Sequence, residues 1–291
     1  MPLRVHETDT ALLREAIAFT SGEIGFNSRL IEKDYFCSVV LEYLAASDAS
    51  LVFKGGTSLS KIHVGFYRLS EDLDFSISTP LTSSRGERSN SVGGLKTIVD
   101  DIPKRLVGFQ VLEALTGSNK STQYNAIVAY QSPVDGHSES IRIEIGLREP
   151  HLTGVEQLTA STAVLNPLNR SPLVEGYPVR CLSYEESMAE KLRAALCREE
   201  VAIRDFYDVD YAVETGRLSI NAPGLIDLLK RKISVPGTPP PDMSAARIGE
   251  LRRQVGTELR SVLREPDVAS FDLDRAVATV SVAFLALGSS R

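Results

Sequence analysis

The feature that most constrains this chain is the stretch from Phe53 to Leu59, which reads Phe-Lys-Gly-Gly-Thr-Ser-Leu and follows a short apolar segment. Two adjacent glycines let a backbone turn sharply and approach a ligand closely. Thr57 and Ser58 have side chains that cap helices, and the free amide groups of a helix start favour phosphate. The pattern predicts a strand over 51–53, a tight turn and a helix over about 58–65, with a phosphate seat at Gly55, Gly56, Thr57 and Ser58.

A pair of aspartates follows on the next predicted strand. Side chains alternate along a strand, so Asp72 and Asp74 project from one face while Leu73 and Phe75 project from the other. Two parallel carboxylates repel each other unless a cation neutralises them, and oxygen-only ligands suit magnesium or manganese. Gly-Gly and Asp-x-Asp are each common in ordinary turns and strand ends. Together and in this order they indicate phosphoryl or nucleotidyl transfer.

These residues also carry a resemblance to a known family. Gly55-Gly56-Thr57-Ser58 followed by Asp72-Leu73-Asp74-Phe75 resembles the opening signature of the DNA-polymerase-β-like nucleotidyltransferase fold. The sequence over 53–61 and 68–75 is similar to the sequences of the AbiEii/AbiGii (MenT-like) toxin branch. The resemblance spans roughly residues 30–215. The interval between Gly56 and Asp72 is somewhat longer than in many polymerase-like relatives, which concerns the intervening helix more than the metal site.

The resemblance implies an α+β fold with a mixed β-sheet flanked by helices and a mainly helical C-terminal domain. We expect a catalytic domain with N-terminal helices over residues 1–160 and a helical domain over 161–291 that contributes Lys191 and Asp208 to the cleft. The boundary is expected near the proline-bearing segment 150–180.

A third carboxylate lies in the segment 141–147, where isoleucines alternate with Arg142, Glu144 and Gly146. The isoleucines are expected to face the core and the charged residues the other way. Polymerase-like transferases have a third acid on a neighbouring strand, and Glu144 matches it in kind and order. Taken alone, such a glutamate would more often be an ordinary solvent-facing residue. The resemblance implies that Asp72, Asp74 and Glu144 form the catalytic and metal-binding set.

Two residues before the second strand are further candidates for nucleotide binding. Arg68 can hold a phosphate with two hydrogen bonds, or it can pair with Glu71. Ser70 shares a face with Asp72 if the strand has already begun. The resemblance implies that a serine here lies at the active site, so we hypothesise that phosphorylation of Ser70 inactivates the protein.

In the second half, Ser183-Tyr184-Glu185-Glu186 is a capping box that opens a helix over about 184–198. Lys191-Leu192-Arg193-Ala194 matches a sequence motif of the family. The resemblance implies that Lys191 contacts the triphosphate and offsets charge as pyrophosphate leaves. The alternative is a surface lysine paired with a nearby acid.

The segment 204–208 carries the last candidate. Arg204 and Asp208 lie one helical turn apart and can pair. The resemblance implies a functional aspartate here, assigned to Asp208, which would orient Lys191 or the attacking hydroxyl; Asp205 is the competing candidate.

The rest of the chain is read from periodicity. Helices are predicted over 9–21, 29–46, 95–106, 223–232, 245–263 and 275–287, and strands over 109–115, 123–130 and 179–182. Residues 82–94 read as a flexible loop. Lys33 lies on the second helix, either in a salt-bridged face or leaning toward the cleft. The arginines of 245–263 either contact an RNA backbone or belong to a solvated charged face.

Composition sets the remaining limits. Hydrophobic residues make up 43% of the 291, enough for a sizeable core, and no apolar run is long enough to cross a membrane. The N-terminus lacks an apolar signal core. Three widely spaced cysteines (Cys37, Cys181 and Cys197) fit a reducing cytoplasm. The net charge of −6 argues against nonspecific nucleic-acid binding over the whole surface.

The resemblance implies a nucleotidyltransferase toxin that uses an NTP and Mg or Mn, modifies the 3′ end of tRNA, blocks translation and is restrained by a cognate antitoxin, with no membrane partner. Transfer to a protein or small-molecule hydroxyl would use the same metal site. A non-catalytic protein that keeps the fold for partner binding is the third possibility. A Walker-type NTPase is disfavoured, because the glycine stretch lacks the Gly-Lys-Ser/Thr ending.

Overall fold

The computed structural model describes residues 3–288, and their contacts divide the chain into a first unit that ends at Leu182 and a second that begins at Ser183. Residues 161–182, expected with the helical domain, therefore belong to the first unit. The reason is that their last strand pairs with the strand at 52–54, in the middle of the sheet. The division between the units lies just after the proline-bearing segment 150–180, near which the boundary was expected.

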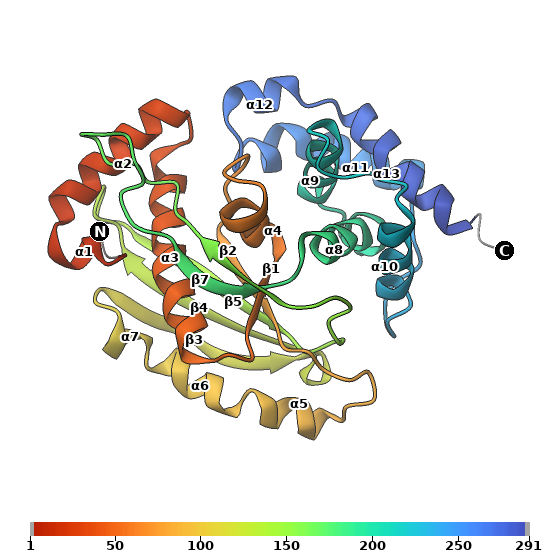
Figure 1. Ribbon diagram of the computed structural model, residues 1–291, viewed down its shortest axis with the longest axis horizontal. Helices are drawn as coiled ribbons and strands as arrows, with labels where there is room; N and C mark the ends of the chain where they lie inside the picture. Colours follow the sequence, from red (N-terminus) through yellow and green to blue (C-terminus); the bar gives the residue numbers. More distant parts are fainter. Residues whose placement is uncertain (1–2, 289–291) are drawn as a thin grey trace. The chain divides into compact units, whose positions relative to one another are not determined.

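The first unit is built on one seven-stranded sheet in the order β3-β4-β5-β2-β1-β7-β6 (Figure 1). The strands are β1 (Val52–Lys54), β2 (Asp72–Ser76), β3 (Phe109–Ser118), β4 (Gln123–Gln131), β5 (Ser138–Gly146), β6 (Glu156–Ala160) and β7 (Tyr177–Cys181). β2 is parallel to β5 and β1 is parallel to β7, while the other neighbouring pairs are antiparallel. The sheet is therefore mixed, as expected.

The described part of the first unit also contains helices. They are α1 (Val5–Thr8), α2 (Thr10–Ile24), α3 (Ser28–Ser47), α4 (Gly55–Ser58), α5 (Arg85–Ser91), α6 (Gly93–Asp100) and α7 (Ile102–Arg105). Leu73, Phe75 and Ile143 point into the core, and none of them is more than 1% exposed. α3 crosses the sheet and α6 and α7 run beside β3 (Figure 1). The apolar sides of β2 and β5 are thus buried in the core.

Three local predictions for this unit need correction. Residues 82–94 are not a loop, because Ser84 and Glu87 form a reciprocal capping box that starts α5. The helix predicted over 95–106 is two helices, and Pro103 sits in the first turn of α7, where its missing N–H is tolerated. β6 was not predicted at all; it is a short, mostly exposed edge strand without alternation.

The second unit is helical in its described part. Its helices are α8 (Tyr184–Cys197), α9 (Ile203–Glu214), α10 (Pro223–Ile233), α11 (Ala245–Gln254), α12 (Glu265–Ser270) and α13 (Leu273–Gly288). α8 packs against α9, α10 and α13. At its start Ser183 accepts a hydrogen bond from Glu186 N, while the Glu186 carboxylate lies 2.7 Å from Lys232 Nζ. The predicted cap is present, but its glutamate is used in a buried ion pair.

The arginines of the helix predicted over 245–263 form hydrogen bonds and ion pairs within the second unit. Arg247 donates to the carbonyl oxygens of Ala195 and Arg198 and so caps the C-terminal end of α8. The others pair with acids: Arg252 with Asp274, Arg253 with Glu250, Arg260 with Glu265 and Arg264 with Asp267. This pairing favours the charged-face interpretation over an RNA contact.

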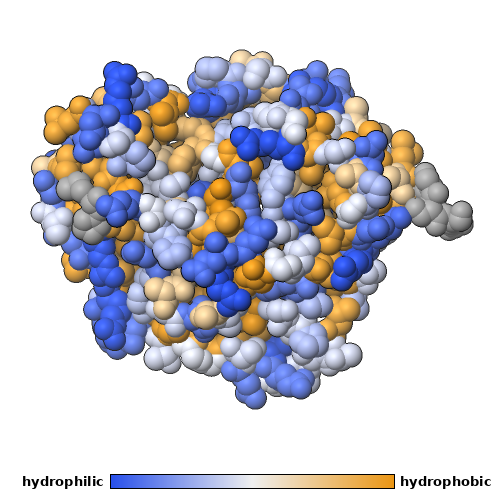
Figure 2. Space-filling model, in the orientation of Figure 1, coloured by the Kyte–Doolittle hydropathy of each residue, from blue (hydrophilic) through white to orange (hydrophobic). Residues whose placement is uncertain are grey.

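The polarity of the surface and the state of the cysteines agree with what the composition predicts. The face drawn in Figure 2 interleaves hydrophilic and hydrophobic residues. Within residues 3–288, no helix has the length and apolar character needed to cross a bilayer.

Cys37, Cys181 and Cys197 are buried free thiols, and burial raises the pKa of Cys37 to about 12. Cys37 therefore stays protonated and acts as a core residue.

Candidate active site

The glycine turn begins a helix earlier than predicted. Gly55 has φ +76°, in the left-handed region that glycine adopts without strain, and α4 starts at that residue. Thr57 and Ser58 are fully buried inside α4 and do not cap it. The Thr57 hydroxyl instead donates to the carbonyl oxygen of Asp72 at 2.5 Å. The capping prediction was wrong because Gly55 itself makes the turn, and the threonine ties the turn to β2.

The three predicted acids stand on one face of the sheet. Asp72 and Asp74 alternate along β2, and Asp74 is the Cα partner of Glu144 on the parallel neighbour β5. Paired residues on neighbouring strands project from the same face. All three are partly exposed, whereas Leu73, between the aspartates, is fully buried. The backbone register alone therefore puts the candidate carboxylates on the same face of two neighbouring strands.

The turn lies directly against this acidic face. A Cβ added to Gly55 would come within 2.3 Å of Asp74 Oδ2, and one added to Gly56 would come within 2.2 Å of Arg68 Nη2. Arg68 is only 2% exposed and donates to the carbonyl oxygen of Leu69. Both glycines are thus required by close approach, one to a carboxylate and one to a buried guanidinium beneath the turn.

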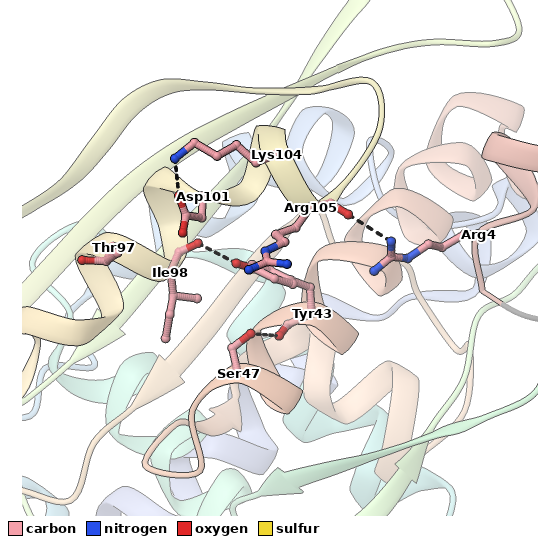
Figure 3. A pocket seen from close by; sticks show the side chains of 8 residues that line it. All are labelled: Arg4, Tyr43, Ser47, Thr97, Ile98, Asp101, Lys104 and Arg105. Atoms are coloured by element: carbon pink, nitrogen blue, oxygen red, sulfur yellow. Dashed lines mark hydrogen bonds and ion pairs between the residues drawn. The ribbon is translucent and has the colours of Figure 1, made fainter.

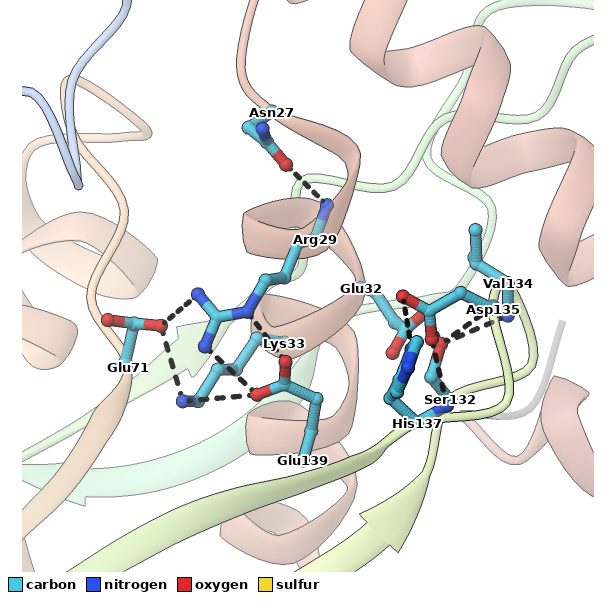
Figure 4. Close-up of polar contacts among 10 residues, drawn as sticks. All are labelled: Asn27, Arg29, Glu32, Lys33, Glu71, Ser132, Val134, Asp135, His137 and Glu139. Carbon is cyan, nitrogen blue, oxygen red and sulfur yellow. Dashed lines mark hydrogen bonds and ion pairs between the residues drawn. The ribbon is translucent and has the colours of Figure 1, made fainter.

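Glu71, the alternative partner of Arg68, belongs to an ion network on α3 (Figure 4). Its Oε1 lies 3.0 Å from Arg29 Nη1 and 3.2 Å from Lys33 Nζ, and Arg29 Nε donates to Glu139 at 2.6 Å. The Glu139 hydrogen bond raises the pKa of Arg29. Lys33 thus follows the salt-bridged interpretation. The network fixes the residue just before Asp72 to α3.

A buried ion pair anchors Lys61, the last residue of the stretch that begins at the glycine turn. Lys61 Nζ lies 2.5 Å from Asp34 Oδ1 and 2.7 Å from Ser38 Oγ, and Asp34 Oδ2 accepts from Ala163 N at 2.8 Å. The Lys61 and Asp34 side chains are 0% and 2% exposed. Sequence reasoning missed this pair, although both residues lie within the span of roughly 30–215 over which the family resemblance extends. It ties the helical segment after Gly55 to α3 and to the segment before β7.

We expect Lys61→Met to destabilise the protein by about 3–5 kcal/mol, because it leaves the Asp34 carboxylate buried without its cation. Lys104→Met is the matched control: Lys104 also pairs with an aspartate, Asp101, but its side chain is 77% exposed, so little change is expected. Denaturant unfolding of both variants measures the difference. Equal midpoints for the two would contradict the structural role of Lys61.

The candidate residues of the second unit also cluster. Lys191 Nζ lies 2.8 Å from Asp205 Oδ1 and 2.9 Å from Asp208 Oδ2. Arg198 Nη1 lies 3.2 Å from the other oxygen of Asp205. Asp208 therefore contacts the lysine that it was predicted to orient, and so does Asp205, its competitor. The suggested partner of Asp208, Arg204, is only part-buried.

The donor set suits a hard cation. Asp72, Asp74 and Glu144 offer only carboxylate oxygens, which magnesium and manganese prefer. Within residues 3–288, no three His, Cys, Asp or Glu side chains have converged closely enough to hold a metal ion. The chemistry and register of the acids fit such an ion, and Ser58 Oγ is a buried oxygen without a hydrogen-bond partner in this part of the chain.

A separate pocket of about 630 Å³ lies on the first unit (Figure 3). Its lining residues are Arg4, Tyr43, Ser47, Thr97, Ile98, Asp101, Lys104 and Arg105. Lys104 pairs with Asp101 at 2.6 Å, and Arg4 donates to the carbonyl oxygen of Arg105. None of the predicted site residues lines it. Its cations lie near the C-terminal ends of α6 and α7, where positive charge is favourable.

A sequence model of one family, described as "Nucleotidyl transferase AbiEii toxin, Type IV TA system", matches residues 40–277. The chain belongs to the AbiEii nucleotidyltransferase toxin family. The AbiEii match covers parts of both units and every candidate residue from Gly55 to Asp208, and it establishes a nucleotidyltransferase toxin of a type IV toxin–antitoxin system. No curated protein sequence matches the chain.

The chain is also similar to solved structures. A nucleotidyltransferase structure from H. pylori is 17% identical, with a TM-score of 0.52 over 90% of this chain and 96% of that chain. JHP933 from Helicobacter pylori is 17% identical, with a TM-score of 0.51 over 90% and 94%. MenT4, a nucleotidyltransferase toxin from Mycobacterium tuberculosis, is 18% identical, with a TM-score of 0.49 over 93% and 98%. At these identities the first two structures establish similarity of fold.

Proposed function

We propose that this AbiEii-family protein transfers a nucleotide from an NTP to the 3′ end of tRNA, releases pyrophosphate and thereby blocks translation. The observation that carries the proposal is the contact geometry of the first unit. The glycine turn abuts Asp74, and Asp74 is flanked by Asp72 along the strand and by Glu144 across it. A phosphate seat thus adjoins a set of acids that suits a divalent cation.

The turn supplies the nucleotide side of the reaction. The first amide groups of α4 have no partners within the helix, and the Lys54 side chain does not cap them. They are suited to donate hydrogen bonds to the triphosphate, with Gly55 and Gly56 allowing close approach and Ser58 offering its hydroxyl. The buried guanidinium of Arg68 lies against Gly56 and supports the turn, so Arg68 is assigned to nucleotide binding as well.

The acids supply the reacting side. Asp72 and Asp74, with Glu144, would hold Mg or Mn, which when bound neutralises charge on the phosphates and activates the attacking oxygen. Glu144 is placed to accept the proton of the attacking hydroxyl. Lys191 is assigned to stabilise the leaving phosphates, and Asp208 to orient Lys191.

The partners follow from the family. A toxin of a type IV toxin–antitoxin system implies an antitoxin. The tRNA acceptor comes from the resemblance, and the net charge of −6 adds nothing to it. A protein or small-molecule hydroxyl is the competing acceptor, because the same acids would serve it.

The test is a labelling assay with purified protein, each labelled NTP, magnesium and total tRNA. We expect label on tRNA with one or more nucleotides. Label only on protein or on a small acceptor would replace tRNA by that acceptor. No label on any acceptor, together with no nucleotide binding, would indicate a non-catalytic member of the fold.

Phosphorylation of Ser70 is expected to abolish transfer. Ser70 lies outside β2, which begins at Asp72, and is part-buried two residues before that acid. A dianion there would repel the carboxylates and compete with the triphosphate. The rate of a stoichiometrically phosphorylated sample, compared with Ser70→Ala treated in the same way, measures the effect. Full activity of the phosphorylated protein would rule the hypothesis out.

A further inference from the structure

The acidic residues belong to rows that continue across the sheet. Glu144 is the Cα partner of Asp74 on one side and of Asn125 on β4 on the other. The neighbouring row runs from Asp72 through Arg142 to Ile127. Partners in register share a face, so Asn125, Ile127 and Arg142 stand on the same side of the sheet as the acids.

This side of β4 and β5 is open. Arg142 is exposed, and Asn125 and Ile127 are part-exposed, whereas Ile141 and Ile143 on the opposite side are fully buried. The surface beside Glu144 is therefore accessible without any rearrangement of the strands.

Arg142 is an exposed arginine in register with one of the acids, Asp72. Arg29 and Arg68 are held by carboxylate or carbonyl oxygens. Within residues 3–288, the Arg142 side chain has neither an ion-pair nor a hydrogen-bond partner, although Asp72 is its Cα neighbour. An arginine next to the acids that is exposed and unengaged is available to bind a phosphate.

Asn125 is oriented by neighbouring amides. Gln123 Nε2 donates to Asn125 Oδ1 at 3.4 Å, and Asn119 Nδ2 donates to Gln123 Oε1 at 3.2 Å. With its oxygen engaged, Asn125 presents its NH₂ group on the row of Glu144. Amide donors of this kind recognise acceptors on nucleobases and ribose. Ile127 adds an apolar surface beside them.

The direction from which the acceptor hydroxyl attacks indicates what the open face of β4 and β5 binds. In nucleotidyl transfer the attacking and leaving oxygens lie roughly in line on opposite sides of phosphorus. The glycine turn contacts Asp74 from the β1 side, so the proposed triphosphate lies there. The attacking hydroxyl must then approach from the β5 and β4 side.

We propose that the open face formed by Asn125, Ile127 and Arg142 is the acceptor subsite and that it binds the single-stranded 3′ end of a nucleic acid. Arg142 holds a backbone phosphate of the acceptor, and Asn125 contacts its terminal nucleotide. A cation, an apolar surface and an amide donor side by side match what a single strand offers. The inference rests on the proposed function and names residues that would position its acceptor.

The first experiment compares wild type with Arg142→Gln in steady-state transfer to tRNA. We expect KM for tRNA to rise about tenfold while KM for the NTP and kcat stay unchanged. The slope of log KM against log salt should fall by about 0.7, the value for one single-strand phosphate contact. Arg105→Gln, which removes an exposed arginine from α7, is the matched control and should leave both quantities unchanged.

The second experiment replaces Asn125 by alanine and uses oligoribonucleotide acceptors that differ only in the 3′-terminal base. We expect the preference of the wild type among these acceptors to shrink at least fivefold, as a lost amide contact implies. Asn90→Ala, which removes an exposed asparagine from α5, is the control and should keep the preference.

The outcomes separate this inference from the function on which it rests. If the wild type labels tRNA but Arg142→Gln keeps its KM and its salt slope, the acceptor subsite is elsewhere. If the wild type labels only a protein or a small molecule, the nucleic-acid acceptor fails and this subsite fails with it. Thermal unfolding of each variant shows whether the fold is intact.

Discussion

Gly55→Ala should lower the rate of nucleotide transfer at least a hundredfold. The added Cβ would lie 2.3 Å from Asp74 Oδ2, a distance that real Cβ contacts do not reach, so the turn or the carboxylate must move. Displacements of about 1 Å at a reacting centre can cost a factor of about 100. Initial rates with labelled NTP and acceptor measure the loss.

Gly65→Ala is the control for this experiment. Gly65 also has positive φ, +86°, but a Cβ there meets no atom within 4 Å. Both substitutions carry the backbone cost of an L-residue in the left-handed region, about 1–2 kcal/mol. Gly65→Ala therefore shows the stability cost of the backbone alone, and it should keep its activity while Gly55→Ala loses it. Equal activity of the two variants would show that the contact with Asp74 does not matter.

Asp72→Asn and Asp74→Asn should each lower kcat about a thousandfold, the effect of losing several kcal/mol of charge stabilisation at a cation. Asparagine keeps the size of the side chain and removes its charge, so folding should be preserved. Transfer assays over a range of magnesium concentrations, together with growth of bacteria that express each variant, measure the effect. Asp100→Asn, an exposed aspartate on α6, is the control.

A variant of Asp72 or Asp74 as toxic and as active as its parent would remove the enzymatic proposal. Activity recovered only at high magnesium would instead indicate weakened binding of the cation, because one carboxylate and Glu144 would remain. The growth assay and the transfer assay should agree if toxicity comes from nucleotide transfer.

The sequence predicted best what depends on neighbours along the chain. Alternation placed Asp72 and Asp74 on one face, and Gly55 marked the turn, because both follow from the backbone geometry of a few residues. The position of Glu144 beside Asp74 needed the resemblance, since periodicity gives the face of a strand but not the register between strands.

What could not be predicted depends on partners far along the chain. Lys61 lies on a pattern that fits an ordinary helix, and only the fold brings Asp34 and Ala163 to it. The use of Glu186 by Lys232 likewise overrides a local capping signal. Ser84 and Glu87 show the opposite error: a short capping box was present in a stretch judged by its serines and glycines alone.

The position of β1 inside the sheet, between β2 and β7, sets the order in which this enzyme can mature. Phe53 pairs with Phe75 on one side and with Cys181 on the other, so the strand before the glycine turn gains its second neighbour only after more than half of the chain has been synthesised. Contacts of such long sequence separation form slowly, because a large loop must close first. A nascent chain on the ribosome therefore carries the turn and the acids well before it can hold them rigid, and the complete toxin emerges late in its own translation.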